Sequence, residues 1–542
     1  MKRGNKYHFN WQIVLLFAVP FLYFALAIYF RTMLGPPSLR SIDPDYIYFI
    51  SGLGIAEGHL QIGHIDNPGT PLQYSIAAAF RITYLFRPHS SSFIQDVLLN
   101  PDLYMAIVNI LLNGLIAIAL FISGKFVYQK TSSIPYALLV QTAPFLPVIW
   151  YDIIGRITPE LMMPIPLLAI NVLLVVFLTG KSKELTNKEI TLFAFLMAFG
   201  LAIKLTFIAI WAAPFLLIKS WKGKGKYLLQ ALLFFFIIAL PVTLQLDIFW
   251  GWIKTLFMHS GNYGGGEANI INIEAFKTGL SELVRLERVF FTILLVTLFI
   301  FLVYLGIIRK KAKKKYVLFA LSLFIAVLAH MLITGKHYAH RYYIPSLMLA
   351  PVFIIFSAEL LKDLIKLKAF KIISNIVLIL FFLWNMNYQF NWIHLKSLAI
   401  GNQVENRKET WHRVESLEEE SIKIIVSQDY GSPFKEYALK FSTAWSANHL
   451  KPYYAEQLGE LYPNVYQYTT WDDKFQYWGE KFNPEKYIKE GTPVYMYLEK
   501  NSEDLLNRAL AKINPDNTFV INFVQTYLNE NNNEVIYQLF FQ

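Results

Sequence analysis

The sequence contains no cysteine, which excludes a disulfide framework and any metal site built on cysteine ligands. Charged residues are also scarce, since Asp, Glu, Lys and Arg make up 16% of the chain against 55% hydrophobic residues. No internal repeat, low-complexity tract or glycine-rich phosphate-binding loop is present, so nothing indicates a nucleotide site. A chain with so little charge has more apolar sequence than a soluble core can bury.

Apolar runs of about twenty residues, the length that a helix needs to cross a bilayer, recur along the first two thirds of the chain. We therefore predict a polytopic α-helical membrane protein. The eleven predicted spans lie near residues 11–30, 104–123, 134–151, 160–179, 189–203, 205–218, 227–246, 289–308, 316–334, 343–361 and 371–390. Residues 71–86 are apolar but carry Arg81, and we expect them to form a helix on the outer membrane surface.

The chain is basic, with a formal net charge of +11 and a pI near 9.2. Its Lys and Arg residues gather in short clusters between the apolar runs, which is the pattern of the positive-inside rule. With the N-terminus inside, the predicted spans place every basic cluster on the cytoplasmic side. We expect a multi-pass protein of the plasma or inner membrane that contacts membrane lipid and no nucleic acid, with its first apolar segment retained as an anchor.

After about residue 391 the apolar runs give way to short strand-like and helix-like segments. The predicted strands are 422–427, 493–498, 518–524 and 534–540, and the predicted helices are 433–441, 454–461 and 502–512. We predict a transmembrane domain over 1–390, with a first outer loop at 31–103, and a soluble extracytoplasmic α/β domain over 391–542. The aromatic residues near position 470 suit either a domain core or a surface that stacks on sugar rings.

The first outer loop concentrates ionisable groups in a chain where carboxylates are scarce. Asp43, Asp45, His64 and Asp66 lie within a few dozen residues of the first span. Two interpretations of Asp43 and Asp45 are open, a helix cap and a reactive site. Asp43 followed by Pro44 is typical of a helix start, because Asp caps free N–H groups and Pro suits the first turn. One carboxylate can also cap while the other reacts.

Further ionisable residues fall beside the predicted spans on the same outer side. They are Asp152, Glu160, Lys204, His337, His340 and Arg341. Ionisable groups at a membrane boundary are costly and so indicate function. Simpler explanations are that Lys204 is a hairpin tip reaching water, that Arg341 is an interfacial anchor, and that the two carboxylates are solvated loop residues.

The order of several motifs resembles the GT-C superfamily, membrane glycosyltransferases that use polyprenyl-phosphate sugars and include protein O-mannosyltransferases and lipid A aminoarabinose transferases. The motifs are DPDY at 43–46, HIDNPGTP at 64–71, GRITPE at 155–160, LAIKLT at 201–206 and HRYYIP at 340–345. The resemblance covers about residues 8–390. It lies in the order of these short motifs and in their common side of the membrane.

The resemblance implies roles for the carboxylates. A first-loop aspartate of the family engages the acceptor and acts as the base of an inverting transfer. The Asp-Pro-x-Tyr pattern matches Asp43 and the Asp-x-x-Tyr pattern matches Asp45, and we favour Asp45. The family's second carboxylate is matched by Asp152 or Glu160.

A leaving phosphate needs positive charge to hold it. The candidates for this role are Lys204, His337, His340 and Arg341. His64 and Asp66 belong to the candidate acceptor loop, where His64 to Pro68 replaces the family's His-Pro-Pro motif. Grouped carboxylates could hold Mg²⁺ or Mn²⁺, and the family includes members with and without a metal. The two His residues lack the third ligand that Zn²⁺ requires.

We predict an inverting glycosyltransferase that moves a sugar from a polyprenyl-phosphate donor to an extracytoplasmic protein, lipid or cell-surface glycan. One alternative is a multi-span transporter, which would need polar or broken helices near mid-membrane. The other is a membrane-anchored binding or assembly protein of the cell envelope. Its working part would be residues 391–542, and it would not need Lys204 or Arg341.

Overall fold

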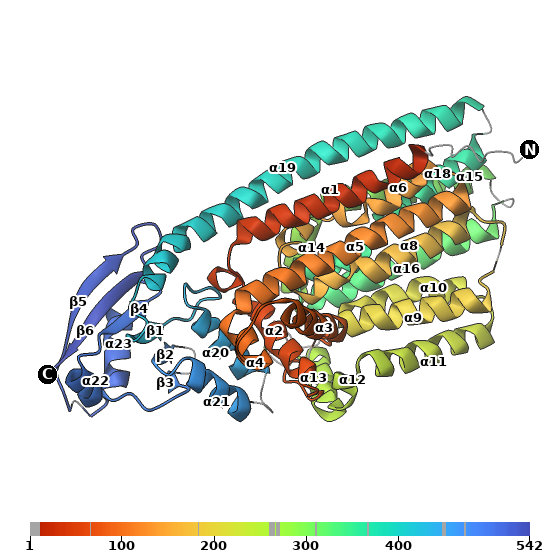
Figure 1. Cartoon of the computed structure of the whole chain (residues 1–542). Coiled ribbons are helices and arrows are strands. Elements are labelled where there is room, and N and C mark those ends of the chain that lie inside the picture. The colour runs from red at the N-terminus through yellow and green to blue at the C-terminus, as the bar shows by residue number, and fades with distance from the viewer. Residues whose placement is uncertain are drawn as a thin grey trace, which may run out of the picture.

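The computed structural model describes residues 11–542 except 66, 183, 260–265, 267–271, 309–311, 366–367, 447–450, 471–472 and 517. Figure 1 shows an elongated molecule, with a bundle of long helices at one end and a mixed α/β domain at the other. α1 begins at the end of the bundle that is farthest from the α/β domain. The predicted fold class, a polytopic helical membrane protein with a C-terminal α/β domain, is confirmed.

All the predicted spans coincide with helical segments. The bundle contains α1 (Trp11–Leu34), α5 (Pro101–Thr131), α6 (Ile134–Gln141), α7 (Trp150–Ile153), α8 (Pro164–Thr179), α9 (Asn187–Ile203), α10 (Ala212–Leu217), α11 (Trp221–Ile238), α12 (Leu240–Thr243), α15 (Arg288–Ile308), α16 (Lys314–Lys336), α17 (Ile344–Leu347), α18 (Ala350–Leu364) and α19 (Lys368–Glu415). Within the described residues, six helical segments are long and apolar enough to cross a membrane. The count of eleven spans stays a prediction.

Several predicted spans are interrupted rather than continuous. The span at 134–151 is broken after α6, where Pro144 and Pro147 lack the N–H groups that would continue the helix. α9 ends at Ile203, and the backbone is extended at Lys204 before the 3₁₀ helix η4 (Leu205–Trp211) begins. Lys204 is only 3% exposed. Lys204 is therefore a buried residue at a helix break and not a hairpin tip in water.

The first outer loop folds into short helices that cover one end of the bundle. They are η1 (Pro37–Leu39), α2 (Ile42–Ala56), α3 (Thr70–Phe86) and α4 (Phe93–Leu99). The helix predicted at 71–86 is thus present, and its place on the membrane surface stays a prediction. Two amphipathic helices, α13 (Leu246–Met258) and α14 (Ile273–Leu286), lie between α12 and α15 in the chain.

The C-terminal domain is a six-stranded mixed sheet with helices on both faces. Its strands are β1 (Ile422–Val426), β2 (Val465–Thr469), β3 (Lys474–Tyr477), β4 (Val494–Leu498), β5 (Ile521–Leu528) and β6 (Val535–Phe541), in the order β3-β2-β1-β4-β6-β5. β1 is parallel to both β2 and β4, and the other pairs are antiparallel. Its helices are α20 (Lys435–Ser446), α21 (Lys451–Leu461), α22 (Pro484–Glu490) and α23 (Glu503–Ile513). The four predicted strands and three predicted helices are all found, with ends shifted by a few residues.

Sequence analysis missed β2 and β3, the strands formed by the aromatic segment near residue 470. Tyr466 and Tyr468 of β2 are 1% and 0% exposed and pack in the sheet's core. These tyrosines cannot stack on a sugar from solvent, so that interpretation is wrong for them. Trp471 lies outside the described residues.

A continuous helix joins the two parts of the molecule. α19 runs unbroken through residue 391, so the predicted domain boundary falls inside a helix, in a stretch that lacks proline. Buried residues of α20 and α21, such as Tyr437 and Tyr454, belong to the same apolar core as the bundle. The C-terminal domain is therefore packed against the outer-loop helices rather than tethered.

Arg407 of α19 connects this domain to the segment before the first aspartates. Its guanidinium donates to the Leu39 carbonyl at 2.7 Å, to Asp429 at 2.7 Å and to Glu534 at 2.8 Å. Backbone N–H groups of Ile42 and Ser432 donate to the carbonyls of Tyr430 and Ser38 across the same contact. Two parts of the chain that are distant in sequence thus form one rigid junction.

We expect Gly431→Ala to weaken this junction. A methyl group on Gly431 would overlap the Leu39 carbonyl and the Arg407 guanidinium, and overpacking of this kind costs about 1–3 kcal/mol. Thermal unfolding of the purified protein in detergent should show a lower Tm. Gly225→Ala is the control, because a methyl group at Gly225 in α11 has no neighbour within 4 Å and alanine favours helix. Equal Tm values for the two variants would contradict the close contact.

Candidate active site

Asp45 is buried and fully engaged at the start of α2. Its carboxylate, 1% exposed, accepts hydrogen bonds from the Arg156 guanidinium at 2.7 and 3.1 Å and from the Ile157 N–H at 2.7 Å. Arg156 also donates to the Asp43 carbonyl at 2.7 Å. Asp45 thus joins the first outer loop to the 155–160 segment through charge-assisted hydrogen bonds, which are stronger than neutral ones.

Asp43 lies beside this pair but has a different environment. The backbone is extended at Asp43, with φ −101° and ψ 124°, so a kink separates Asp43 from the rest of α2. The interpretation of Asp43 as a helix cap stays a prediction. Burial raises the pKa of Asp43, although the positive charges of Arg341, His64 and Arg156 act against this effect. A partly buried carboxylate with a raised pKa and cations around it is the kind of group that can accept a proton.

Glu160 is the centre of a buried charge cluster. Its carboxylate, 1% exposed, pairs with the Lys204 ammonium and lies 3.5 Å from the Arg341 Nε. The Lys204 ammonium also lies over the Tyr342 ring at 4.3 Å from its centroid. The 155–160, 201–206 and 340–345 motifs, which lie far apart in the sequence, therefore converge on one point.

Arg341 connects the Glu160 cluster to the first outer loop. It is an ion-pair partner of Glu160 and lies close enough to Asp43 to lower its pKa by charge. Its side chain keeps 32% of its surface exposed, whereas Lys204 keeps 4%. The structure thus brings Glu160, Lys204 and Arg341 together, and Asp43 lies within electrostatic range of Arg341. The interfacial-anchor interpretation of Arg341 does not account for these contacts.

The loop that leads to α3 is held against this region. The His64 ring packs edge-on against Tyr48 at 5.1 Å, and the Tyr48 hydroxyl donates to the Asn67 carbonyl at 3.2 Å. Gly69 has a positive φ of 59°, and a side chain there would overlap the Tyr48 ring. Glycine is required at this close approach. His64 lies within electrostatic range of Asp43, while Asp66 is outside the described residues.

The other predicted residues lie around the cluster rather than in it. His340 Nε2 is 2.7 Å from Glu287 Oε1, and His337 Nε2 is 2.9 Å from the Leu256 carbonyl. Asp152 pairs with Lys396 of α19 at 2.5 Å. In the described residues these three side chains make contacts of their own with α13, with Glu287 between α14 and α15, and with α19.

Sequence analysis missed several functional-site residues. Arg156 was recognised only as part of the GRITPE motif, with no role of its own, although it binds Asp45. Arg40 lies within electrostatic range of Arg156, Asp152 and Asp45. Glu287, 1% exposed, accepts from the Val148 N–H at 2.9 Å and binds His340. The sequence feature that could have indicated Glu287 is its position just before an apolar run.

No group of three or more His, Asp or Glu side chains in the described ranges is placed to hold a metal ion. Asp45 is bound by Arg156, and Glu160 by Lys204 with Arg341. The Mg²⁺ or Mn²⁺ site stays a prediction, and the chemistry below contains no step through a metal.

Comparison with known proteins gives similarity of structure only. No protein-family model matches the chain, and no curated protein sequence matches it either. Two crystal structures of ArnT from Cupriavidus metallidurans, one bound to undecaprenyl phosphate and one in the apo state, align with TM-scores of 0.49 and 0.48. Each shares 12% sequence identity and covers 96% of this chain and 97% of ArnT.

We expect Lys204→Ala to destabilise the protein by about 3–5 kcal/mol, because it leaves Glu160 buried with one fewer cation. The double variant Lys204→Met/Glu160→Gln removes both charges and should recover most of that loss. Thermal unfolding in detergent measures both. If the double variant is as unstable as the single one, the pair is not the source of the stability.

Asp43→Asn and Asp45→Asn should change stability in opposite directions at pH 7. Because the pKa of Asp43 is raised in the folded state, the protonated side chain stabilises the fold fully below the unfolded-state pKa of about 4. This stabilisation is lost as pH rises through the folded-state pKa. Asp43→Asn therefore raises Tm at pH 7, and this gain shrinks towards pH 4. Asp45→Asn leaves Arg156 without its carboxylate and should cost about 3 kcal/mol. The measurement is a series of thermal unfolding curves at different pH values. Equal effects of the two substitutions would show that Asp43 and Asp45 do not differ in environment.

Proposed function

We propose that the protein is an inverting membrane glycosyltransferase that moves a sugar from a polyprenyl-phosphate donor to an acceptor on the extracytoplasmic side. The observation that carries this proposal is that Arg341, which pairs with Glu160 beside Lys204, also acts by charge on the Asp43 carboxylate. It supports a site in which a candidate base lies near candidate phosphate-binding cations. Asp43 lies at the start of α2, a helix that packs against α20 of the C-terminal domain.

Asp43 is the group we assign as base. Both oxygens of Asp45 already accept hydrogen bonds from Arg156 or Ile157, so Asp45 positions the loop. The pKa of Asp43 is raised by burial, which makes its carboxylate a better proton acceptor. Asp43 takes the proton of an acceptor hydroxyl while that oxygen attacks the anomeric carbon of the donor sugar.

The leaving group is the polyprenyl phosphate. The bond between the anomeric carbon and the phosphate oxygen breaks as the new glycosidic bond forms on the opposite face of the sugar. Arg341, the more exposed of the two cations, is the group we assign to meet the phosphate, and Lys204 adds positive charge behind it. Glu160 holds both cations in place before the donor arrives, which avoids reorganisation during the reaction.

The net charge of the site supports an anionic donor. Its basic side chains are Arg40, Arg156, Lys204 and Arg341, and its carboxylates are Asp43, Asp45 and Glu160. The basic groups outnumber the carboxylates by one, and protonation of Asp43 during transfer increases that excess. The site therefore holds the phosphate more strongly just when the phosphate gains negative charge.

We expect Asp43→Asn to lower kcat for sugar transfer by about 10² or more, because a missing general base costs 10²–10⁴. The measurement is release of undecaprenyl phosphate from a set of undecaprenyl-phosphate-linked hexoses and aminosugars, with membrane extract as the acceptor source. The wild-type rate should also fall as pH drops through the raised pKa of Asp43. Arg341→Ala should instead raise the KM for the donor as well as lower kcat.

Glu57→Gln is the matched control for this assay. Glu57 is another carboxylate of the first outer loop, and it pairs with the exposed Arg81 at 2.8 Å, outside the cluster. We expect this variant to transfer at the wild-type rate. Undiminished transfer in Asp43→Asn would remove the proposed base. Absence of transfer by the wild-type protein from every donor would favour the transporter or the binding and assembly protein.

A further inference from the structure

The C-terminal domain contains a topological switch point. The chain leaves the central strand β1 for β2 on one side and later returns to β4 on the other, and both neighbours are parallel to β1. The connections diverge, because α20 packs in the core shared with the bundle and α23 packs on the opposite face of the sheet. In open α/β sheets, ligands bind in the crevice that such divergence leaves at the carboxyl ends of the strands.

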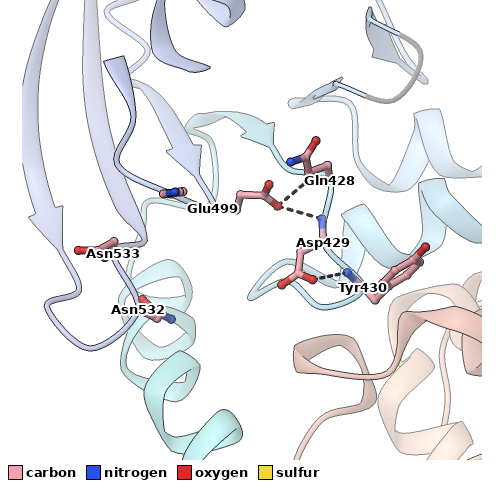
Figure 2. Close-up of a pocket in the computed structure, with 7 residues that line it drawn as sticks. Gln428, Asp429, Tyr430, Glu499, Asn532 and Asn533 are labelled. Atoms are coloured by element: carbon pink, nitrogen blue, oxygen red, sulfur yellow. Dashed lines mark hydrogen bonds between the residues drawn. The ribbon is translucent and has the colours of Figure 1, made fainter. Parts of the chain in front are cut away.

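A cavity of about 700 Å³ occupies this position. We call it the sheet-edge cleft. Figure 2 shows its lining residues, which come from the segment after β1, the segment after β4 and the turn between β5 and β6: Gln428, Asp429, Tyr430, Glu499, Lys500, Asn532 and Asn533. The volume lies within the range of small-molecule binding sites.

The sheet-edge cleft is held in shape by its own hydrogen bonds. One oxygen of Glu499 accepts from the Ser427 hydroxyl at 2.7 Å and from the backbone N–H groups of Gln428 and Asp429 at 2.7 and 2.9 Å. Asp429 accepts from Arg407 at 2.7 Å and from the Tyr430 N–H at 2.8 Å. A ligand that binds there meets a rigid wall, which reduces the entropic cost of binding.

The lining chemistry fits a neutral polyhydroxylated ligand. Amide side chains from two loops supply both donors and acceptors, and carboxylate oxygens accept from hydroxyl groups. Tyr430, whose side chain is 46% exposed, provides an aromatic face. Lys500 is the only basic residue among those that line the cleft in the described structure, and two carboxylates oppose it. This composition does not suit phosphate.

We propose that the sheet-edge cleft binds a saccharide, carried by the acceptor of the transfer reaction. Identifying the saccharide as part of the acceptor rests on the proposed function, whereas its binding in the cleft does not. The Tyr430 carbonyl accepts from the Ile42 N–H at 3.1 Å, and Ile42 directly precedes Asp43. A saccharide seated against Tyr430 thus binds a residue whose backbone is hydrogen-bonded to the loop of the candidate base.

The test is direct binding of neutral oligosaccharides to the purified full chain in detergent. Saturation-transfer NMR with a panel of hexose and N-acetylhexosamine trisaccharides is expected to show saturable binding. Tyr430→Ala and Asn533→Gly should each weaken this binding about fivefold, as expected for loss of one aromatic or amide contact. Asn533 has a positive φ of 61°, so glycine keeps the backbone and removes only the amide.

Tyr477→Ala is the matched control, because Tyr477 is a similarly exposed tyrosine, at 39%, on the edge strand β3. It should bind the trisaccharides as the wild type does. No saturable binding across the panel, or equal loss in Tyr477→Ala, overturns the proposal. Competition by inorganic phosphate that is removed by Lys500→Ala would also overturn it, because the cleft would then be an anion site.

The experiment separates this proposal from the transferase proposal. Asp43→Asn leaves the lining of the sheet-edge cleft intact, so it should bind the trisaccharides with wild-type affinity. Transfer without saccharide binding refutes the cleft alone. Saccharide binding without transfer from any donor refutes the proposed function and the acceptor assignment, and leaves the cleft as a saccharide site.

Discussion

The ion pairs of Glu160 with Lys204 and Arg341 are the interaction on which the rest of the site depends. A buried ammonium is costly without a partner, so α9 can end at Lys204 inside the bundle only because Glu160 meets it there. Arg341 then joins the pair from a third segment of the chain. One carboxylate thereby determines where three breaks in the helical bundle come together.

The ion pair of Asp45 with Arg156 determines where the first outer loop meets the bundle. Their contact joins the start of α2 to the 155–160 segment, which itself leads into Glu160. The two ion-pair systems are therefore adjacent in the chain and mutually supporting. Asp43 lies between them, within the charge of Arg341 and Arg156. Its distinctive property is that burial raises its pKa while these positive charges act against the rise.

Much of this arrangement could be predicted from the sequence. Apolar runs locate the helices, and rare charges beside them indicate Glu160, Lys204 and Arg341, because membrane helices tolerate few ionisable residues. What could not be predicted is which charged side chains pair with one another. Asp45 and Asp43 are similar in sequence, and only three-dimensional packing shows that Arg156 takes one of them. The tyrosines of β2 were ambiguous for the same reason, since a core strand and a stacking surface share a composition.

The unbroken helix α19 determines how the two parts of the molecule can move. Its 48 residues correspond to about 70 Å at 1.5 Å per residue, more than twice the apolar thickness of a bilayer of about 30 Å. The helix therefore acts as a rigid strut that sets the height of the sheet above the lipid.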